Sequence, residues 1–169
     1  MSFRERPIIS IPQSQEALVL NFVALAGLAV ILTIAIRSWF TLPERFPIHF
    51  DLSGQPNGWG GKISLWIFPI ISIILYGGLT FLNRYPHIFN YPVQITAENA
   101  SRQYQIACSF LNWLKAEMIW IFAYTEWMIY YLATSSQPKF GWIFFPLILL
   151  IISVFSTTGF FLRQTFLAR

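Results

Sequence analysis

Four long apolar runs alternate with shorter polar segments along the chain. Residues 17–36 and 63–82 contain no charged side chain, and residues 118–133 and 142–162 are almost as apolar. A helix rises about 1.5 Å per residue, so about twenty residues span about 30 Å, the hydrocarbon thickness of a bilayer. The pattern predicts an all-α integral membrane protein, in which these four runs are the transmembrane helices of one domain over residues 17–169.

The first run can also be compared with a cleaved signal peptide. It is longer than the apolar part of such peptides, and a basic and aromatic segment at residues 37–39 follows it in place of a small-residue cleavage site. We therefore expect residues 17–36 to remain in the membrane. Residues 1–16 are expected to form a short, loosely ordered leader.

The third helix is predicted to start well before its apolar part. Thr96 is a suitable N-cap, and Glu98 then falls in the first turn, where the helix dipole favours an anion. A continuous helix over residues 97–133 would measure about 55 Å, which exceeds the bilayer core. We therefore expect its first half to be a long amphipathic cytoplasmic extension, which projects from the membrane or lies along its surface.

Prolines and glycines mark the breaks between these helices and the irregular points within them. Prolines predict a non-helical connector over residues 83–97 and a turn over residues 134–141. Pro69 is expected either to kink the second helix or to occupy its first turn, where a missing N–H matters least. Gly77 and Gly78 are expected to let a neighbouring helix approach closely.

Composition supports the membrane assignment and excludes some other classes. The chain is 56% hydrophobic and 11% charged, whereas soluble domains carry about 25% charged residues. The net charge of +4 comes from scattered Lys and Arg residues, so no basic cluster indicates a nucleic-acid partner. Cys108 is the single cysteine of the sequence; it can form no intrachain disulfide and is expected to be a packing residue.

The distribution of Lys and Arg residues predicts the orientation. With four spans, one side receives Arg4, Arg6, Arg84, Arg102, Lys115, Arg163 and Arg169. The other side receives Arg37, Arg45, Lys62 and Lys139. The positive-inside rule then places both termini and the 83–97 connector in the cytoplasm, and the loop over residues 37–62 outside.

The segment LPERFPIHFDLSGQPNGWGGK, residues 42–62, is the long polar stretch between the first two apolar runs. Pro43 and Pro47 favour extended backbone around them. Gly54 and the Pro- and Gly-rich residues 56–61 are typical of turns. The sequence therefore predicts an ordered loop without a helix of its own.

His49 and Asp51 are the residues of this loop whose side chains could bind a metal ion or hold a proton. On an extended segment they would point the same way, but two ligands fall short of a metal site and no third is evident. The sequence also lacks the common nucleophile, zinc-protease, phosphate-loop and paired-cysteine motifs. We expect no catalytic residue, metal or cofactor. In the simpler interpretation, His49 holds the loop by hydrogen bonds while Phe46, Phe50 and Trp59 pack at the bilayer edge.

Glu126 is the second candidate, because a carboxyl group inside an apolar run is costly and marks a functional site by default. At 100° per residue it shares one helix face with four other residues. These are Asn112, Lys115, Ile119 and Phe122. The stripe is either a polar path through the membrane, or a site where Glu126 is protonated or hydrogen-bonded across a helix interface. Glu117 falls on the opposite face and is expected to reach water.

The 42–62 segment resembles the signature of a bacterial membrane domain family of unknown function, which reads roughly LPxxxPxHFDxxGxPxxWGxK between the first two transmembrane helices. The matching positions are Leu42, Pro43, Pro47, His49, Phe50, Asp51, Gly54, Pro56, Asn57, Trp59, Gly60 and Lys62. The family includes the N-terminal part of SdpI-type immunity proteins, which protect a bacterium from its own secreted toxin. The resemblance implies membership of this domain family and assigns no catalytic residues. On this comparison, the present chain is expected to lack the additional C-terminal transmembrane domain of those immunity proteins.

These observations predict a non-enzymatic, multi-pass bacterial membrane protein in a binding, sensing or immunity role. Its recognition surface would comprise Pro43, Pro47, His49, Phe50, Asp51, Gly54, Pro56, Trp59, Gly60 and Lys62. The expected partners are the lipid bilayer and a protein, such as a toxin, a regulator or a larger membrane complex. Two alternatives remain open: an accessory or assembly subunit of a larger membrane complex, and a transporter-like protein that uses Glu126.

Overall fold

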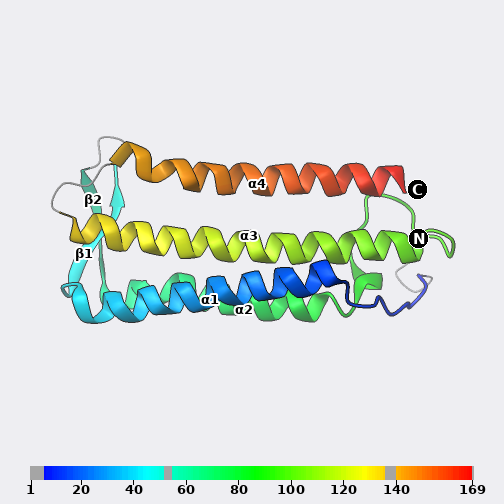
Figure 1. The fold of residues 1–169 in the computed structure, drawn as a ribbon, viewed down its shortest axis with the longest axis horizontal. Coiled ribbons are helices and arrows are strands. Elements are labelled where there is room, and N and C mark those ends of the chain that lie inside the picture. Colours follow the sequence, from blue (N-terminus) through cyan, green and yellow to red (C-terminus); the bar gives the residue numbers. More distant parts are fainter. Residues whose placement is uncertain (1–5, 52–54, 136–139, 169) are drawn as a thin grey trace.

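Four long helices lie side by side in the computed structural model, which describes residues 6–51, 55–135 and 140–168. They are α1 (Gln15–Thr41), α2 (Ile67–Leu82), α3 (Ala100–Thr134) and α4 (Phe140–Leu167). In Figure 1, α3 runs through the middle, with α1 and α2 on one side and α4 on the other. As predicted, four helices are long and apolar enough to cross a membrane, α2 together with the short 3₁₀ helix η2 (Lys62–Trp66) before it.

The two ends of the chain lie at the same end of the bundle, as an even number of spans requires (Figure 1). The connector between α2 and α3 lies there too, and a β-hairpin lies at the opposite end. Which end faces the cytoplasm stays a prediction. Arg4, Lys139 and Arg169, which entered the charge count, and Gly54 of the loop lie outside the described residues.

Local signals explain why α1 is longer than the apolar run that predicted it. The Ser14 side chain accepts a hydrogen bond from the backbone N–H of Ala17 (3.1 Å) and caps the first turn. The helix ends at Thr41, immediately before Leu42 and Pro43, because proline disfavours helical backbone at the residue that precedes it.

Small residues of α1 pack against α3. The buried positions of α1 recur every three to four residues, and they are Ala17, Leu20, Ala24, Gly27, Leu28, Ile31, Ala35 and Ser38. A Cβ atom at Gly27 would lie 2.8 Å from Cγ2 of Ile119, so this glycine is the point of closest fit. The expected role of Gly77 and Gly78 is wrong, since a Cβ atom at either position would meet nothing within 4 Å.

The all-α prediction missed a two-stranded antiparallel sheet. Strand β1 (Arg45–Phe50) pairs with β2 (Pro56–Gly61). The extended backbone expected around Pro47 is present, but residues 56–61 form a strand where turns were predicted. Pro69 follows the second of its two expected placements, because it is the third residue of α2 and lies in its first turn.

The first half of α3 is covered by the chain segments around it. Ile9 and Ile11 of the leader pack with Tyr91 and Val93 of the connector against the buried cluster of Ile95, Ala100 and Tyr104. The leader over residues 1–16 was expected to be loosely ordered, but its described part is held by hydrogen bonds at Arg6 and Pro7. Arg6 donates to the carbonyls of His87 and Phe89, and the Tyr104 hydroxyl donates to the carbonyl of Pro7 (3.0 Å).

The start of α3 shows a reciprocal pair of hydrogen bonds. The backbone N–H of Thr96 donates to Oδ1 of Asn99 (2.9 Å), and the N–H of Asn99 donates to Oγ1 of Thr96 (3.3 Å). Thr96 therefore satisfies a backbone donor as predicted, although regular helix begins only at Ala100. The connector is not wholly irregular, because Pro86–Ile88 form the short 3₁₀ helix η3.

The expectation that Glu117 reaches water is wrong. Its side chain is buried, and Oε1 accepts hydrogen bonds from the hydroxyls of Ser153 (2.6 Å) and Thr157 (2.7 Å) of α4. The helical period correctly placed Glu117 away from Glu126. It could not show that α4 would cover that second face with hydroxyl groups.

Candidate functional site

The hairpin, residues 45–61, is held in shape by its own side chains. His49 lies opposite Gly58 in the sheet, and its Nδ1 atom hydrogen-bonds Oδ1 of Asn57. A Cβ atom at Gly58 would lie 2.8 Å from Cβ of His49, so glycine allows the two strands to meet here. With Nδ1 engaged, Nε2 of the imidazole is the nitrogen left for a further hydrogen bond.

Asp51 forms two hydrogen bonds with Gln55 at the end of the paired strands. Its N–H donates to the carbonyl of Gln55, and its Oδ1 accepts from the N–H of Gln55, both at 2.9 Å. Within the described residues, no group of three or more His, Cys, Asp or Glu side chains is placed to hold a metal ion. The geometry of this segment is therefore that of a folded hairpin held by local hydrogen bonds.

Apolar side chains anchor the hairpin to the helices. Phe46 is buried with Leu42 and Leu65, and this cluster packs against Ile129 and Tyr130 of α3. Phe46 therefore does not lie at the bilayer edge, as the sequence suggested, but in the core between the hairpin and α3.

The other two aromatic residues of the hairpin differ from each other. Phe50 packs against the buried cluster of Met128, Leu132 and Ile143, so it belongs to the contact with α3 and α4 and not to the bilayer edge. Trp59 is 55% exposed and is available to lipid or to a partner.

Charged and aromatic side chains secure the base of the hairpin. Lys62 pairs with Glu44 at 3.3 Å. Its ammonium group also lies 6.0 Å from the ring centroid of Trp39, which in turn contacts Trp66. The ion pair with the exposed Glu44 adds little stability by itself. The structural role of Lys62 is therefore its combined contacts at the junction of α1, the hairpin and α2.

The remaining predicted residues of the loop have structural positions along the strands. Pro43 follows the end of α1, Pro47 lies opposite Trp59, and Pro56 lies opposite Phe50. A Cβ atom at Gly60 would lie 2.9 Å from both Cγ2 of Ile48 and Oγ of Ser64.

A cavity of about 360 Å³ lies beneath the hairpin. Its walls include Phe46, Ile48, His49 and Phe50 of β1, and Glu126 of α3. The sequence presented the loop and Glu126 as two separate candidates, and the structure places both in the wall of one cavity. No periodicity or motif could have shown this, because it depends on β1 packing across the end of α3.

Glu126 has a carboxyl oxygen that no described residue of this cavity hydrogen-bonds. Its side chain is 2% exposed, and its buried Oε1 atom accepts no hydrogen bond from the described residues. The two hydroxyls in the wall already donate to backbone carbonyls, Thr125 to Ile121 (2.8 Å) and Ser64 to Gly61 (2.7 Å). A buried carboxyl oxygen without a partner is costly, so the cavity is suited to a ligand that carries a hydrogen-bond donor.

The polar stripe on α3 does not form a continuous path. Asn112 and Lys115 line a second cavity at the end of the bundle where the chain termini lie. Between the two cavities, Ile119 is fully buried and Phe122 stacks on Phe68 of α2 with ring centroids 5.4 Å apart. Lys115 is fully buried within the bundle, so it does not contribute to the surface charge of the terminal end, as the orientation count assumed.

Comparison with known proteins supports the family assignment at a coarse level. Residues 24–73 match the family described as "Domain of unknown function (DUF1648)", over the second half of α1, the hairpin and the start of α2. The chain is also 33% identical, over 76 residues, to an uncharacterized protein of Archaeoglobus fulgidus. That match covers 40% of this chain and 42% of the relative, which is less than half the length of each protein. No solved structure matches the chain.

The family match includes the hairpin, and neither match names an activity. They fit the predicted relation to a membrane domain of unknown function. Kinship with the SdpI-type immunity proteins stays a prediction.

Proposed function

We propose that this protein is a non-enzymatic, multi-pass membrane protein that binds an apolar ligand beneath the hairpin, with residues 42–62 as its recognition surface. The observation that carries the proposal is that Glu126, whose buried Oε1 atom accepts no hydrogen bond from the described residues, is one of the residues that line an otherwise largely apolar cavity. Ligand sites are typically apolar clefts in which a few polar groups fix the orientation of the ligand.

The side chains around the cavity indicate the class of ligand. Phe46, Phe50 and Ile48 offer apolar contact, while Glu126 would accept a hydrogen bond from an amine, a hydroxyl or a peptide N–H group. Trp59 on the exposed part of the hairpin would contact a larger ligand outside the cavity. An apolar peptide, or a lipid-like molecule with one donor group, fits this combination.

The biological setting follows from the predicted orientation. If both termini are cytoplasmic, the hairpin and its cavity face outward from a bacterial membrane. A site in that position suits the sensing of an extracellular molecule, or immunity against a secreted peptide toxin.

Photocrosslinking in native membranes tests this function. A benzophenone-bearing phenylalanine analogue would replace Ile48, which lines the cavity, and in a control chain it would replace Phe155, which is 73% exposed on α4. We expect intact-mass analysis to show a discrete adduct at position 48 that position 155 does not give. Lipid adducts alone, identical at the two positions, would contradict the proposal.

Two substitutions link the adduct to the site. Glu126→Leu and Trp59→Ala should each reduce the adduct at position 48 strongly, while the amount of protein in the membrane stays unchanged. Replacing a buried unpaired carboxyl with an apolar side chain is not expected to destabilise the bundle. Trp142→Ala, at an 81% exposed tryptophan near the start of α4 and outside residues 42–62, is the matched control and should leave the adduct intact.

A further inference from the structure

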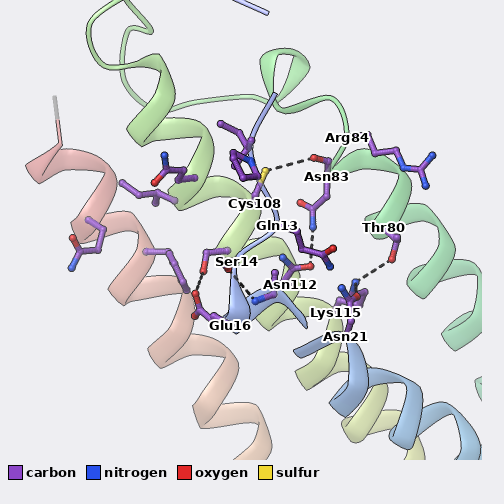
Figure 2. A pocket seen from close by; sticks show the side chains of 18 of the residues that line it. Gln13, Ser14, Glu16, Asn21, Thr80, Asn83, Arg84, Cys108, Asn112 and Lys115 are labelled. Atoms are coloured by element: carbon purple, nitrogen blue, oxygen red, sulfur yellow. Dashed lines mark hydrogen bonds between the residues drawn. The ribbon is translucent and has the colours of Figure 1, made fainter. Parts of the chain in front are cut away.

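A second and larger cavity, of about 750 Å³, opens at the end of the bundle opposite the hairpin. It lies between the start of α1, the end of α2 and the first half of α3, with α4 contributing an apolar wall that includes Phe160 and Phe161. Figure 2 shows polar side chains from three of these helices converging on it, among them Asn21, Thr80, Asn112 and Lys115.

Lys115 is the buried cation of this cavity. Its Nζ atom donates to Oδ1 of Asn21 (2.5 Å) and to Oγ1 of Thr80 (3.0 Å), and it lies 4.8 Å from the ring centroid of Tyr76. Both hydrogen-bond partners are neutral, and no carboxylate among the described residues forms an ion pair with it. An ammonium group has three donors, so one donor and the full charge of Lys115 are left for an anion.

The other charged groups of the cavity do not neutralise Lys115. The carboxylate of Glu16 accepts hydrogen bonds from Ser109 (2.8 Å) and from the indole N–H of Trp113 (2.5 Å). Arg84 also lines the cavity, so two cations oppose one carboxylate that already has two donors of its own. The balance of charge in the cavity therefore favours an anionic ligand.

Two asparagines add polar groups of both kinds. Nδ2 of Asn83 donates to Oδ1 of Asn112 (2.9 Å), which leaves Nδ2 of Asn112 as a donor beside Lys115. The buried Oδ1 atom of Asn83 accepts no hydrogen bond from the described residues. The cavity thus offers a cation and a donor for an anion, together with an acceptor for a hydroxyl or ammonium group on the same ligand.

The position of Lys115 along the bundle matches that of lipid headgroups. The segment Lys62–Leu82 is 21 residues long, which is about the length needed to cross a bilayer, so we place one membrane boundary at its end, Leu82. Lys115 contacts Thr80, within one turn of that boundary. Basic pockets between transmembrane helices at this level are suited to phospholipid headgroups.

From these observations we infer that the cavity around Lys115 binds a phosphate group, carried by the headgroup of an anionic phospholipid. Lys115 and Asn112 contact the phosphate oxygens, and Asn83 accepts a hydrogen bond from a hydroxyl of the headgroup. Phe160 and Phe161 provide an apolar wall beside the lipid chains. This site is separate from the cavity beneath the hairpin and does not depend on the function proposed for it.

Native mass spectrometry of the detergent-solubilised full chain tests the site with two probes, phosphatidylglycerol and diacylglycerol with the same acyl chains. We expect wild-type protein to retain phosphatidylglycerol and not diacylglycerol. Lys115→Met should weaken the retention about tenfold, as the loss of one charge-assisted hydrogen bond predicts. Lys115→Arg keeps the charge and should retain most of the binding. Arg163→Met removes one positive charge from an exposed position at the same end, and should change binding little.

Competition with inorganic phosphate identifies the source of the phosphate group. Displacement of phosphatidylglycerol by phosphate would show that the site also accepts the free ion, and a lack of displacement would show that it requires the lipid. Both results support phosphate recognition. Equal retention by wild type and Lys115→Met would overturn the inference, and so would equal losses in Lys115→Met and Arg163→Met. The melting temperature of each variant, measured in the same detergent, separates loss of binding from loss of fold.

Discussion

Gly27 of α1 lies against Ile119 of α3, so close that a Cβ atom at position 27 would come within 2.8 Å of Cγ2 of Ile119. Trp120 stands on the same side of Gly27, at 3.3 Å from that Cβ position, and its indole N–H donates to the carbonyl of Val23 (3.0 Å). Ile119 lies between Lys115 and Glu126 on α3. The contact between Gly27 and Ile119 therefore lies between the two cavities and separates them.

Gly27→Val should destabilise the bundle, because the added isopropyl group has no space between α1 and α3. The expected loss of unfolding free energy is about 1–3 kcal/mol, as for other overpacked cores. Thermal unfolding in one detergent measures it. Gly78→Val is the matched control, since a Cβ atom there meets nothing within 4 Å. If the two variants unfold at the same temperature, Gly27 does not set the distance between the helices.

The position of α4 rests in part on one carboxyl group of α3. Glu117 accepts hydrogen bonds from the hydroxyls of Ser153 and Thr157. Thr157→Val removes one of them and should lower the unfolding free energy by about 1 kcal/mol. The neighbouring Thr158→Val is the control, because the Thr158 hydroxyl donates to the carbonyl of Val154 in its own helix (2.8 Å). Equal stability of the two variants would show that the interhelical bonds contribute nothing measurable.

The sequence predicted the parts of this fold that depend on local pattern. Four apolar runs identified the four helices, and the extended backbone around Pro47 was anticipated from the restrictions that proline imposes. The strand over residues 56–61 was not predicted, because glycine is usual in turns and unusual in strands. Here Gly58 faces the side chain of His49 across the sheet, and that requirement arises only once the strands are paired.

The candidate site could be predicted only in its separate pieces. The loop signature identified His49, and the cost of a carboxyl group in an apolar run identified Glu126. Their common cavity is a result of tertiary packing. The error at Glu117 has the same origin: the helical period gives the direction of a side chain, but not the residues of α4 that Glu117 contacts.

The hairpin should be sensitive to a single methyl group at one position and tolerant of it three residues later. Gly58→Ala would place a Cβ atom 2.8 Å from Cβ of His49, whereas the nearest atom at Gly61 is a backbone oxygen of Glu44 at 3.6 Å, an ordinary contact. We expect Gly58→Ala to separate the strands at His49, break the hydrogen bond to Asn57, and speed the amide hydrogen exchange of residues 45–50. Gly61→Ala should leave that exchange unchanged.

Because the hairpin lies at one end of the bundle, neither variant should lower the unfolding temperature of the helices as far as Gly27→Val does. Slow exchange in Gly58→Ala would mean that β1 is held by its contacts with α3 and not by its pairing with β2.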